Sequence, residues 1–289
     1  MEHQLNIFTG KIDTKTDQGK VKALDELFEL SAKYKKSSEF FKLLEFINKF
    51  PNLSPFNAFL IHTQDSAAKI VLSAYKWNKY GRRVKPLSRP FIILVPFGPV
   101  EFVYDISDTE PINGIEETIP ESLLKPFLTK GDLPPAIYNR TVKNAEKDSI
   151  DYFEEKMQMG GAGYASTFTN NRFKVTINSQ YCINEKFSTL VHELAHIYCG
   201  HQGSVKGNWW ESRKGILSKE AREIEAESVS YLVCVRNGLE TTSPEYLSGY
   251  IKEDKELPDI SLETILIVAN YIETMGTGAF KPKKKRILT

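Results

Sequence analysis

The chain has 289 residues, of which 41% are hydrophobic and 11% aromatic, so it can build a substantial core. Its 38 basic and 37 acidic residues nearly cancel, and the net charge of +1 argues neither for nor against a polyanionic partner. The amino terminus lacks a basic segment followed by an apolar run, and no stretch approaches the roughly 18 apolar residues that cross a bilayer. We therefore expect a globular cytoplasmic protein with no membrane partner.

The cysteine content indicates reduced thiols. The three cysteines, Cys182, Cys199 and Cys234, are widely spaced and form no Cys-x-x-Cys pair. An odd, scattered set of this kind fits free thiols better than disulfides or a cysteine zinc site.

The first part of the chain predicts several helices followed by a pair of strands. Apolar residues recur at helical spacing, and Ser54-Pro55 has the form of a helix start. Helices are expected at residues 17–34, 40–50, 55–63 and 68–79. The basic segment 82–90 contains two prolines and predicts a loop. Residues 91–95 and 100–104, which flank Pro-Phe-Gly-Pro, predict a strand hairpin.

A polar, acidic stretch at residues 107–120 marks the expected boundary between two domains, residues 1–110 and 111–289. After it, helices are expected at residues 135–157, 222–237, 244–251 and 262–275. Two strands, 164–169 and 172–178, flank Asn170-Asn171, a pair that tolerates the backbone of a tight hairpin. The predicted fold class is therefore α+β, with a smaller α+β domain at the amino terminus.

The most informative motif lies in the helix that follows this hairpin. His192-Glu193-x-x-His196 places two imidazoles one helical turn apart on the same face, a spacing that lets them share one metal ion. Zinc would lower the pKa of a bound water to about 7, and Glu193 would take its proton for attack on a carbonyl. The motif predicts metal-assisted hydrolysis.

A catalytic zinc site needs a third protein ligand. The metzincin pattern would need Gly and His at positions that hold Cys199 and Gln202, so it does not apply. His201 follows the helix-ending Gly200 and is a poor candidate. The downstream helix is a better source, because Glu223 and Glu227 share one of its faces while Glu225 points elsewhere.

This set of residues, continued by the segment EIEAESVSYLV, resembles the ImmA/IrrE metallopeptidases and the carboxy-terminal domain of ArdC-type antirestriction proteins. The resemblance implies a zincin-like domain with its active-site helix next to a small antiparallel sheet. It also implies that Glu223 is the third metal ligand, and that Glu227 accepts a hydrogen bond from a ligating histidine. In ImmA-like proteins the residue at the position of Glu227 is often Asn or Asp.

Other parts of the site are left open by the sequence. Tyr164, Tyr181, Tyr198 and Tyr231 could each stabilise an oxyanion, but each is more often a packed aromatic, and none is assigned. The strand at 172–178 could offer an edge to an extended peptide or could equally be a plain core strand.

The amino-terminal segments SPFNAFLIHTQ and AYKWNKYGRRVKPLSRPFIILVPF resemble in outline the amino-terminal domain of ArdC-like proteins, which implies binding of single-stranded DNA. Aromatic and cationic residues alternate here, as in sites that stack bases and contact phosphates. The residues expected to do so are Trp77, Arg82, Arg83 and Lys85. Trp77 can equally be a core residue, and the cations can equally belong to a solvated loop.

Two functions follow from these patterns. The preferred one is a zinc-dependent endopeptidase with His192, His196 and Glu223 as ligands and Glu193 as general base, and the resemblance to ImmA/IrrE proteins implies a regulatory protein substrate such as a repressor. The alternative is an ArdC-like antirestriction protein that binds single-stranded DNA and carries a metal-binding carboxy-terminal domain.

Overall fold

The structure is a computed structural model of the chain that describes residues 34, 36–95, 100–120, 123, 132–157, 162–167, 172–240, 256–278 and 280–283. The helices expected at residues 17–34 and 244–251 lie outside this part of the chain, apart from Tyr34.

The described part of the chain is a mixed α+β structure, as the sequence predicts. Its helices are α2 (Ser37–Asn48), α3 (Pro55–Gln64), α4 (Ala74–Lys79), α6 (Pro135–Lys147), α7 (Ile183–Tyr198), α8 (Lys219–Arg236) and α10 (Leu262–Met275). Its strands are β1 (Val71–Ser73), β2 (Arg82–Val84), β3 (Phe91–Ile93), β4 (Glu101–Asp105), β5 (Thr109–Pro111), β6 (Ile150–Glu155), β7 (Gly163–Thr167) and β8 (Phe173–Asn178). None of the described helices is long and apolar enough to cross a membrane.

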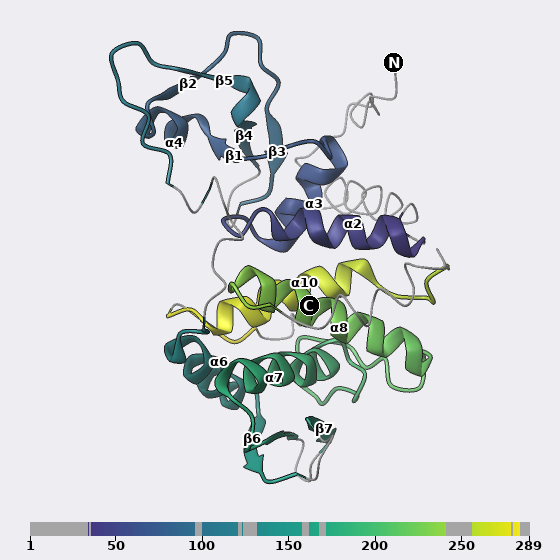
Figure 1. Ribbon diagram of the computed structural model, residues 1–289. Helices are drawn as coiled ribbons and strands as arrows, with labels where there is room; N and C mark the ends of the chain where they lie inside the picture. The colour runs from purple at the N-terminus through teal and green to yellow at the C-terminus, as the bar shows by residue number, and fades with distance from the viewer. Residues whose placement is uncertain are drawn as a thin grey trace.

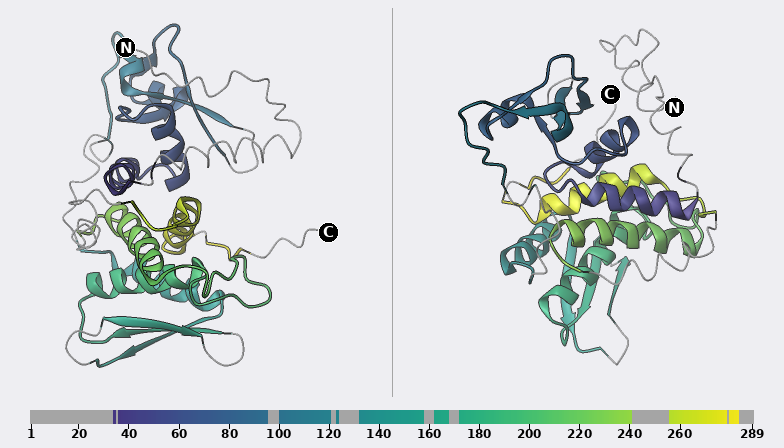
Figure 2. Two further views of the ribbon diagram at one scale, coloured as in Figure 1. Left: turned by 90° about the vertical axis from the view of Figure 1, so that its right-hand side faces the viewer. Right: turned by 45° about the horizontal axis from the view of Figure 1, so that its top comes forward.

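The elements are stacked in layers, as Figure 1 and the left view of Figure 2 show. The sheet of β6, β7 and β8 is covered by α6 and α7, and α7 packs in turn on α8. Helix α10 lies beside α8, and the next layer is formed by α2 and α3. The small sheets β1-β4-β3 and β2-β5 lie beyond them, at the far end of the molecule from β6.

One apolar core joins most of these layers. It includes Leu43 of α2, Phe59 of α3, Leu194 of α7 and Ile272 of α10, each almost completely buried. Because the helices of the amino-terminal part share this core with the helices that follow residue 111, the layers depend on each other for burial of apolar surface. The domain boundary near residue 110 stays a prediction.

The carboxy-terminal end of α8 is tied to the turn between α2 and α3 by Arg236. Its guanidinium donates hydrogen bonds to the carbonyl oxygens of Ile47, Phe50 and Leu53, at distances of 3.1, 3.1 and 2.6 Å. The same group forms an ion pair with Glu273 of α10. A single buried cation therefore connects α8 both to α10 and to the layer formed by α2 and α3.

The sheet beside α7 is mixed rather than antiparallel, which corrects the expected small antiparallel sheet. Strand β8 is central, pairing antiparallel with β7 and parallel with β6. The hairpin partners β7 and β8 are as predicted. The extra strand arises because the helix expected at 135–157 ends at Lys147, and Ser149, with φ of 63°, turns the chain back so that residues from Ile150 extend along β8.

The amino-terminal elements match the prediction in part. Helices α2 and α3 and the antiparallel pair β3 and β4 are found where expected. The helix expected at 68–79 is instead the short strand β1 followed by α4, because Val71 and Leu72 are buried against β4. The expected loop at 82–90 contains β2, which pairs with β5.

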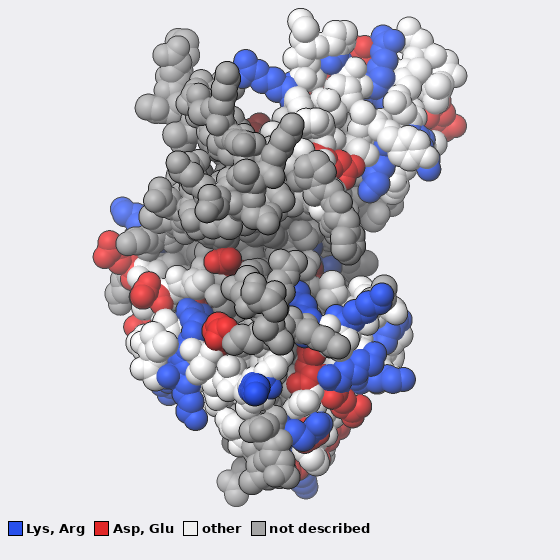
Figure 3. All heavy atoms as spheres, turned by 180° about the vertical axis from the view of Figure 1, so that it is seen from behind, with Lys and Arg blue, Asp and Glu red and all other residues white. Residues whose placement is uncertain are grey.

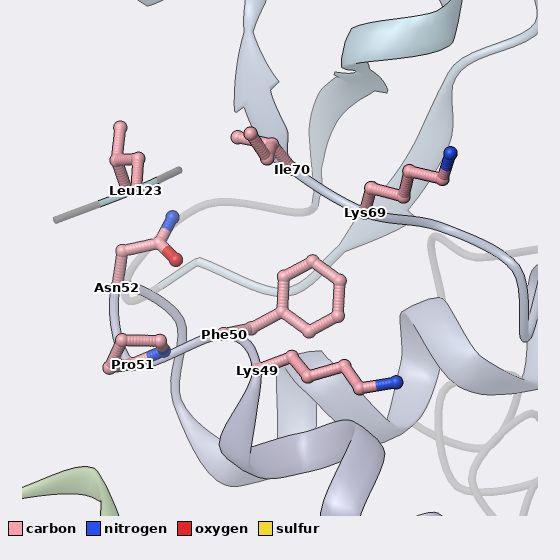
Figure 4. Close-up of a pocket in the computed structure, with 7 residues that line it drawn as sticks. All are labelled: Lys49, Phe50, Pro51, Asn52, Lys69, Ile70 and Leu123. Carbon is pink, nitrogen blue, oxygen red and sulfur yellow. The ribbon is translucent and has the colours of Figure 1, made fainter. Parts of the chain in front are cut away.

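A small hollow lies where the end of α2 approaches the start of β1 (Figure 4). Its lining contains no carboxylate, imidazole or thiol, so it lacks the side chains that usually bind zinc. The lining residues are Lys49, Phe50, Pro51, Asn52, Lys69, Ile70 and Leu123.

Candidate metal centre

Three side chains from two packed helices converge on one point. The Nε2 atoms of His192 and His196, both on α7, lie 3.1 Å apart. Oε2 of Glu223, on α8, lies 3.6 Å from each of these nitrogens. Two ligand atoms on a tetrahedral zinc with bonds of about 2.0–2.1 Å are separated by about 3.4 Å. The three separations bracket that value, so the residues fit a metal ion without rearrangement.

Local sequence signals fix the two helices that carry these ligands. At the start of α7, the carboxylate of Glu185 accepts a hydrogen bond of 2.8 Å from the backbone N–H of Cys182. At the start of α8, Oγ of Ser218 accepts one of 3.0 Å from the N–H of Ala221. The apolar faces of both helices are buried against each other, which sets the distance between the histidines and Glu223.

The electrostatics of the three ligands suit a cation. Burial alone would lower the pKa of His192, but the carboxylates of Glu223 and Glu227 outweigh it and raise that pKa to about 10. Both imidazoles hold the pKa of Glu223 well below its usual range. Without a metal, a proton on His192 balances the carboxylates, so metal binding must displace that proton.

Glu193 lies next to the three ligands and is directed toward β7. Its side chain is almost buried, and its carboxylate hydrogen-bonds to the backbone of Ala165. Burial raises the pKa of Glu193, although the neighbouring histidines oppose the rise. A carboxylate with a raised pKa is a better proton acceptor near neutral pH than an exposed one.

Glu227 contacts the ring nitrogen of His192 that faces away from the other ligands. Oε2 of Glu227 lies 3.0 Å from Nδ1 of His192. A hydrogen on Nδ1 leaves Nε2 free to bind a metal, which is the arrangement expected for a ligating histidine. The structure thus brings together all five residues that the sequence places at the metal site.

His201 has a contact that sequence reasoning missed. Its Nδ1 lies 2.9 Å from Nδ1 of His196, and its Nε2 lies 2.9 Å from Oε2 of Glu225. Burial lowers the pKa of His201, so the ring is kept neutral. A signal was present in the sequence, because a glycine that ends a helix folds the next residue back toward the last turn.

The predicted nucleic-acid contacts lie far along the chain from this centre, in α4 and in β2 and the residue that follows it. Trp77 is completely buried, and its Nε1 donates a hydrogen bond of 2.9 Å to the carbonyl oxygen of Tyr104. Arg82 is largely buried and donates to Thr109 and Glu117. In this structure neither side chain is open to a base or a phosphate.

Arg83 and Lys85 are exposed but already paired. Nε of Arg83 lies 2.8 Å from a carboxylate oxygen of Glu110, and Nζ of Lys85 donates to the carbonyl oxygen of Ser107 at 2.8 Å. On the face shown in Figure 3, the cations of the described residues lie among aspartates and glutamates. The exposed aromatic rings among the described residues of this region include Tyr75 and Phe102, and Nζ of Lys79 lies 4.7 Å from the centroid of the Tyr75 ring.

Two of the tyrosines considered as oxyanion donors have structural partners. The hydroxyl of Tyr198 donates to the buried carboxylate of Asp148 at 2.8 Å. The ring of Tyr231 is stacked on Phe41, with 5.8 Å between the centroids. Neither tyrosine is assigned as an oxyanion donor at the metal centre.

The fold and site define a chain with a candidate metal centre, formed by a His-Glu-x-x-His motif on one helix and a glutamate from a second helix. No protein-family model matches the chain, and no curated protein sequence matches it. Among solved structures it is similar to the metal-free antirestriction protein ArdC of plasmid R388, with a TM-score of 0.36 and 12% identity over 77% of this chain and 82% of that one. The Mn(II)-bound structure of the same protein gives a TM-score of 0.35 and 12% identity, covering 77% of this chain and 84% of that one.

Proposed function

We propose that the protein is a zinc-dependent endopeptidase whose metal is held by His192, His196 and Glu223. The observation that carries this proposal is the close triangle of two imidazole nitrogens and one carboxylate oxygen, with Glu193 beside it. Two histidines and one glutamate are a donor set that catalytic zinc takes in hydrolases, with one position left for the reaction.

The residues around the metal have separate tasks. When bound, zinc polarises a carbonyl oxygen and makes water more acidic. Glu193 accepts the proton of the attacking water on its carboxylate and later gives it to the leaving amine. Its burial raises its pKa, so the protonated form persists long enough to act as an acid. Glu227 keeps the hydrogen of His192 on Nδ1.

The sheet beside α7 offers a place for an extended peptide. Strand β8 is paired with β6 at one edge and with β7 at the other. The strand at residues 172–178, which the sequence offered as a possible edge for a peptide, is therefore not available for strand addition. Strand β7 is an edge strand, and Ala165, on its unpaired side, hydrogen-bonds to Glu193. A substrate strand added to β7 would therefore run past Glu193, which is the geometry of recognition by strand addition.

The test compares the wild type with Glu193→Gln, using bound zinc and cleavage of a library of quenched-fluorescence peptides. The variant should bind zinc as the wild type does but cleave about 100- to 10,000-fold more slowly, the usual contribution of a general base. Glu220→Gln, an exposed carboxylate on α8, is the matched control and should cleave normally. A wild type that takes up no zinc, or a Glu193→Gln variant that still cleaves, contradicts the proposal.

A second candidate function is that of an antirestriction protein whose amino-terminal sheets bind single-stranded DNA. The observation that favours it is the exposed ring of Tyr75 with Lys79 beside it, because an exposed aromatic next to a cation can stack a base and contact a phosphate. Binding to an oligonucleotide should then weaken with salt and with Tyr75→Ala. Absence of binding at low salt removes this candidate.

A further inference from the structure

The end of α7 places His201 beneath the metal ligand His196. The helix closes at Gly200, whose φ of 77° lets the N–H of His201 bond to the carbonyl oxygen of His196 at 3.0 Å and the N–H of Gly200 bond to that of Ile197. A Cβ at Gly200 would lie 2.1 Å from the carbonyl oxygen of Glu211, so glycine is required here. This turn folds the imidazole of His201 back against His196.

The hydrogen bonds that follow have one consistent direction. A metal at Nε2 of His196 requires the hydrogen of that ring to be on Nδ1. The ring then donates from Nδ1 to Nδ1 of His201, 2.9 Å away. Because His201 accepts on Nδ1, its own hydrogen is on Nε2, from which it donates to Glu225 at 2.9 Å.

Glu225 is the last member of this series of hydrogen bonds, and its buried carboxylate is fully paired. Its oxygens accept hydrogen bonds from NH1 and NH2 of Arg213 at 2.6 and 2.7 Å, and from the backbone N–H of Ser261 at 2.7 Å. Its side chain is completely buried. Since it has only acceptors, Glu225 can take only the tautomer of His201 that carries its hydrogen on Nε2.

The same region contains another group of potential ligands, namely Cys199, His201 and Glu225. A second metal ion there is disfavoured because the guanidinium of Arg213 already neutralises the carboxylate and occupies both of its oxygens. Both ring nitrogens of His201 are also engaged. These residues therefore hold the ring of His196 in place and do not form a second metal site.

We propose that His201, held by Glu225 and Arg213, is a positioning residue that fixes the orientation and tautomer of His196 for metal binding. The proposal rests on the proposed metal site and adds the device that prepares one of its ligands. The two histidines are thus prepared differently, since His192 contacts a carboxylate directly whereas His196 reaches one through a second imidazole. Partners of this kind usually contribute 10- to 100-fold to metal affinity.

The experiment measures Zn2+ affinity by chelator competition for the wild type, His201→Phe and His201→Asn. Phenylalanine offers no acceptor to His196 and should weaken Zn2+ binding by about 10- to 100-fold. Asparagine places an amide oxygen near the position of Nδ1, so it should restore affinity to within a few-fold of the wild type. Thermal unfolding of the metal-free proteins reports any purely structural loss.

Wild-type affinity in His201→Phe, or equal weakening in both variants, overturns the proposal. If His201→Phe does not fold, His201→Gln replaces it, because its longer side chain reaches toward Glu225 and leaves His196 without an acceptor. NMR of the histidine rings in the metal-free protein separates this proposal from the proposed function. Hydrogen on Nδ1 of His196 in the wild type, lost in the variant without an acceptor, supports positioning even if the wild type binds no Zn2+; an unchanged tautomer contradicts it.

Discussion

Charged residues serve different purposes at the two ends of the molecule. Around the metal centre, His192, His196 and Glu223 turn their ligand atoms toward one another and leave room for a cation. In the amino-terminal sheets, Arg83 pairs with Glu110 across the strand pair β2-β5, and Arg82 pairs with Glu117, which follows β5. A helical motif thus brings potential ligand atoms to one point, whereas the charges on and beside the paired strands pair with one another.

A motif of charged residues predicts a site reliably when the local backbone fixes the spacing of its side chains. Ligands one helical turn apart converge because the helix itself fixes their spacing. Cations interleaved with aromatics have no such local constraint, and the partners of Arg82, Arg83 and Lys85 lie 22 or more residues away along the chain.

The largest effect on stability is expected at Arg236, which connects α8 to α10 and to the segment between α2 and α3. Arg236→Met removes the cation that pairs with Glu273 and binds three carbonyl oxygens of the α2–α3 turn. Leaving a buried partner uncompensated costs about 3–5 kcal/mol, so the free energy of unfolding should fall by that amount in denaturant titration. The control Arg140→Met, on an exposed position of α6, should change it by less than about 0.5 kcal/mol. Equal effects would mean that the layers do not depend on Arg236.

The next effect concerns the ligand from the second helix. Glu223→Gln should weaken Zn2+ binding by more than about 100-fold, beyond the range of partners that only orient a ligand. Glu220→Gln, one turn earlier on α8, should bind Zn2+ as the wild type does. Chelator competition measures both values. If Glu223→Gln retains its affinity, the third ligand is a different residue.

The sequence predicts well that His192, His196 and Glu223 lie together, because most of their arrangement is local. The i and i+4 positions of His192 and His196 and the shared face of Glu223 and Glu227 follow from helix geometry. The partner of His196 is harder to foresee, because it depends on the closing turn at Gly200 and on Glu225 from another helix.

The parallel strand of the mixed sheet also could not be predicted from local sequence patterns. The helix at 135–157 was predicted too long because the turn at Ser149 uses neither glycine nor proline. Strand β6 then pairs parallel with β8, a contact between segments 23 residues apart at Ile150 and Phe173. Parallel partners joined by a long connection leave no hairpin signal in the sequence.

Two buried aspartates outside the metal centre, Asp105 and Asp148, differ from each other in their hydrogen bonds. Asp105 in β4 accepts from the backbone N–H groups of Lys69 and Ile70 with one oxygen and from Ser107 with the other. Asp105→Asn replaces one acceptor by an N–H₂ group and should cost about 1–3 kcal/mol of stability near neutral pH. Glu110→Gln, in the exposed pair with Arg83, should cost less than about 1 kcal/mol.

The pH dependence of this effect has a definite sign. Burial would raise the pKa of Asp105, but the hydrogen bonds from Lys69, Ser107 and Ile70 outweigh it and lower that pKa. A folded pKa below the unfolded value stabilises the protein above about pH 4 and loses that contribution as the pH falls through the folded pKa. The advantage of the wild type over Asp105→Asn should therefore shrink in acid, and a constant difference would contradict this assignment.

Asp148, which accepts hydrogen bonds from Tyr198 of α7 and Tyr271 of α10, should show the smallest effect and the opposite pH dependence. A single oxygen of Asp148, Oδ2, accepts from both Tyr198 and Tyr271, at 2.8 and 2.6 Å. The amide oxygen of Asp148→Asn can replace it, so stability near neutral pH should change by less than about 1 kcal/mol.

Burial raises the pKa of Asp148, although the two tyrosines oppose the rise. Because the folded state then holds its proton more tightly than the unfolded state, the contribution of Asp148 is fully present below about pH 4 and is lost as the pH rises through the folded pKa. The wild type should thus gain stability relative to Asp148→Asn on acidification, as measured by denaturant titration across that range. If both aspartate variants followed the same pH trend, burial would not dominate at Asp148, and the contrast between the two carboxylates would fail.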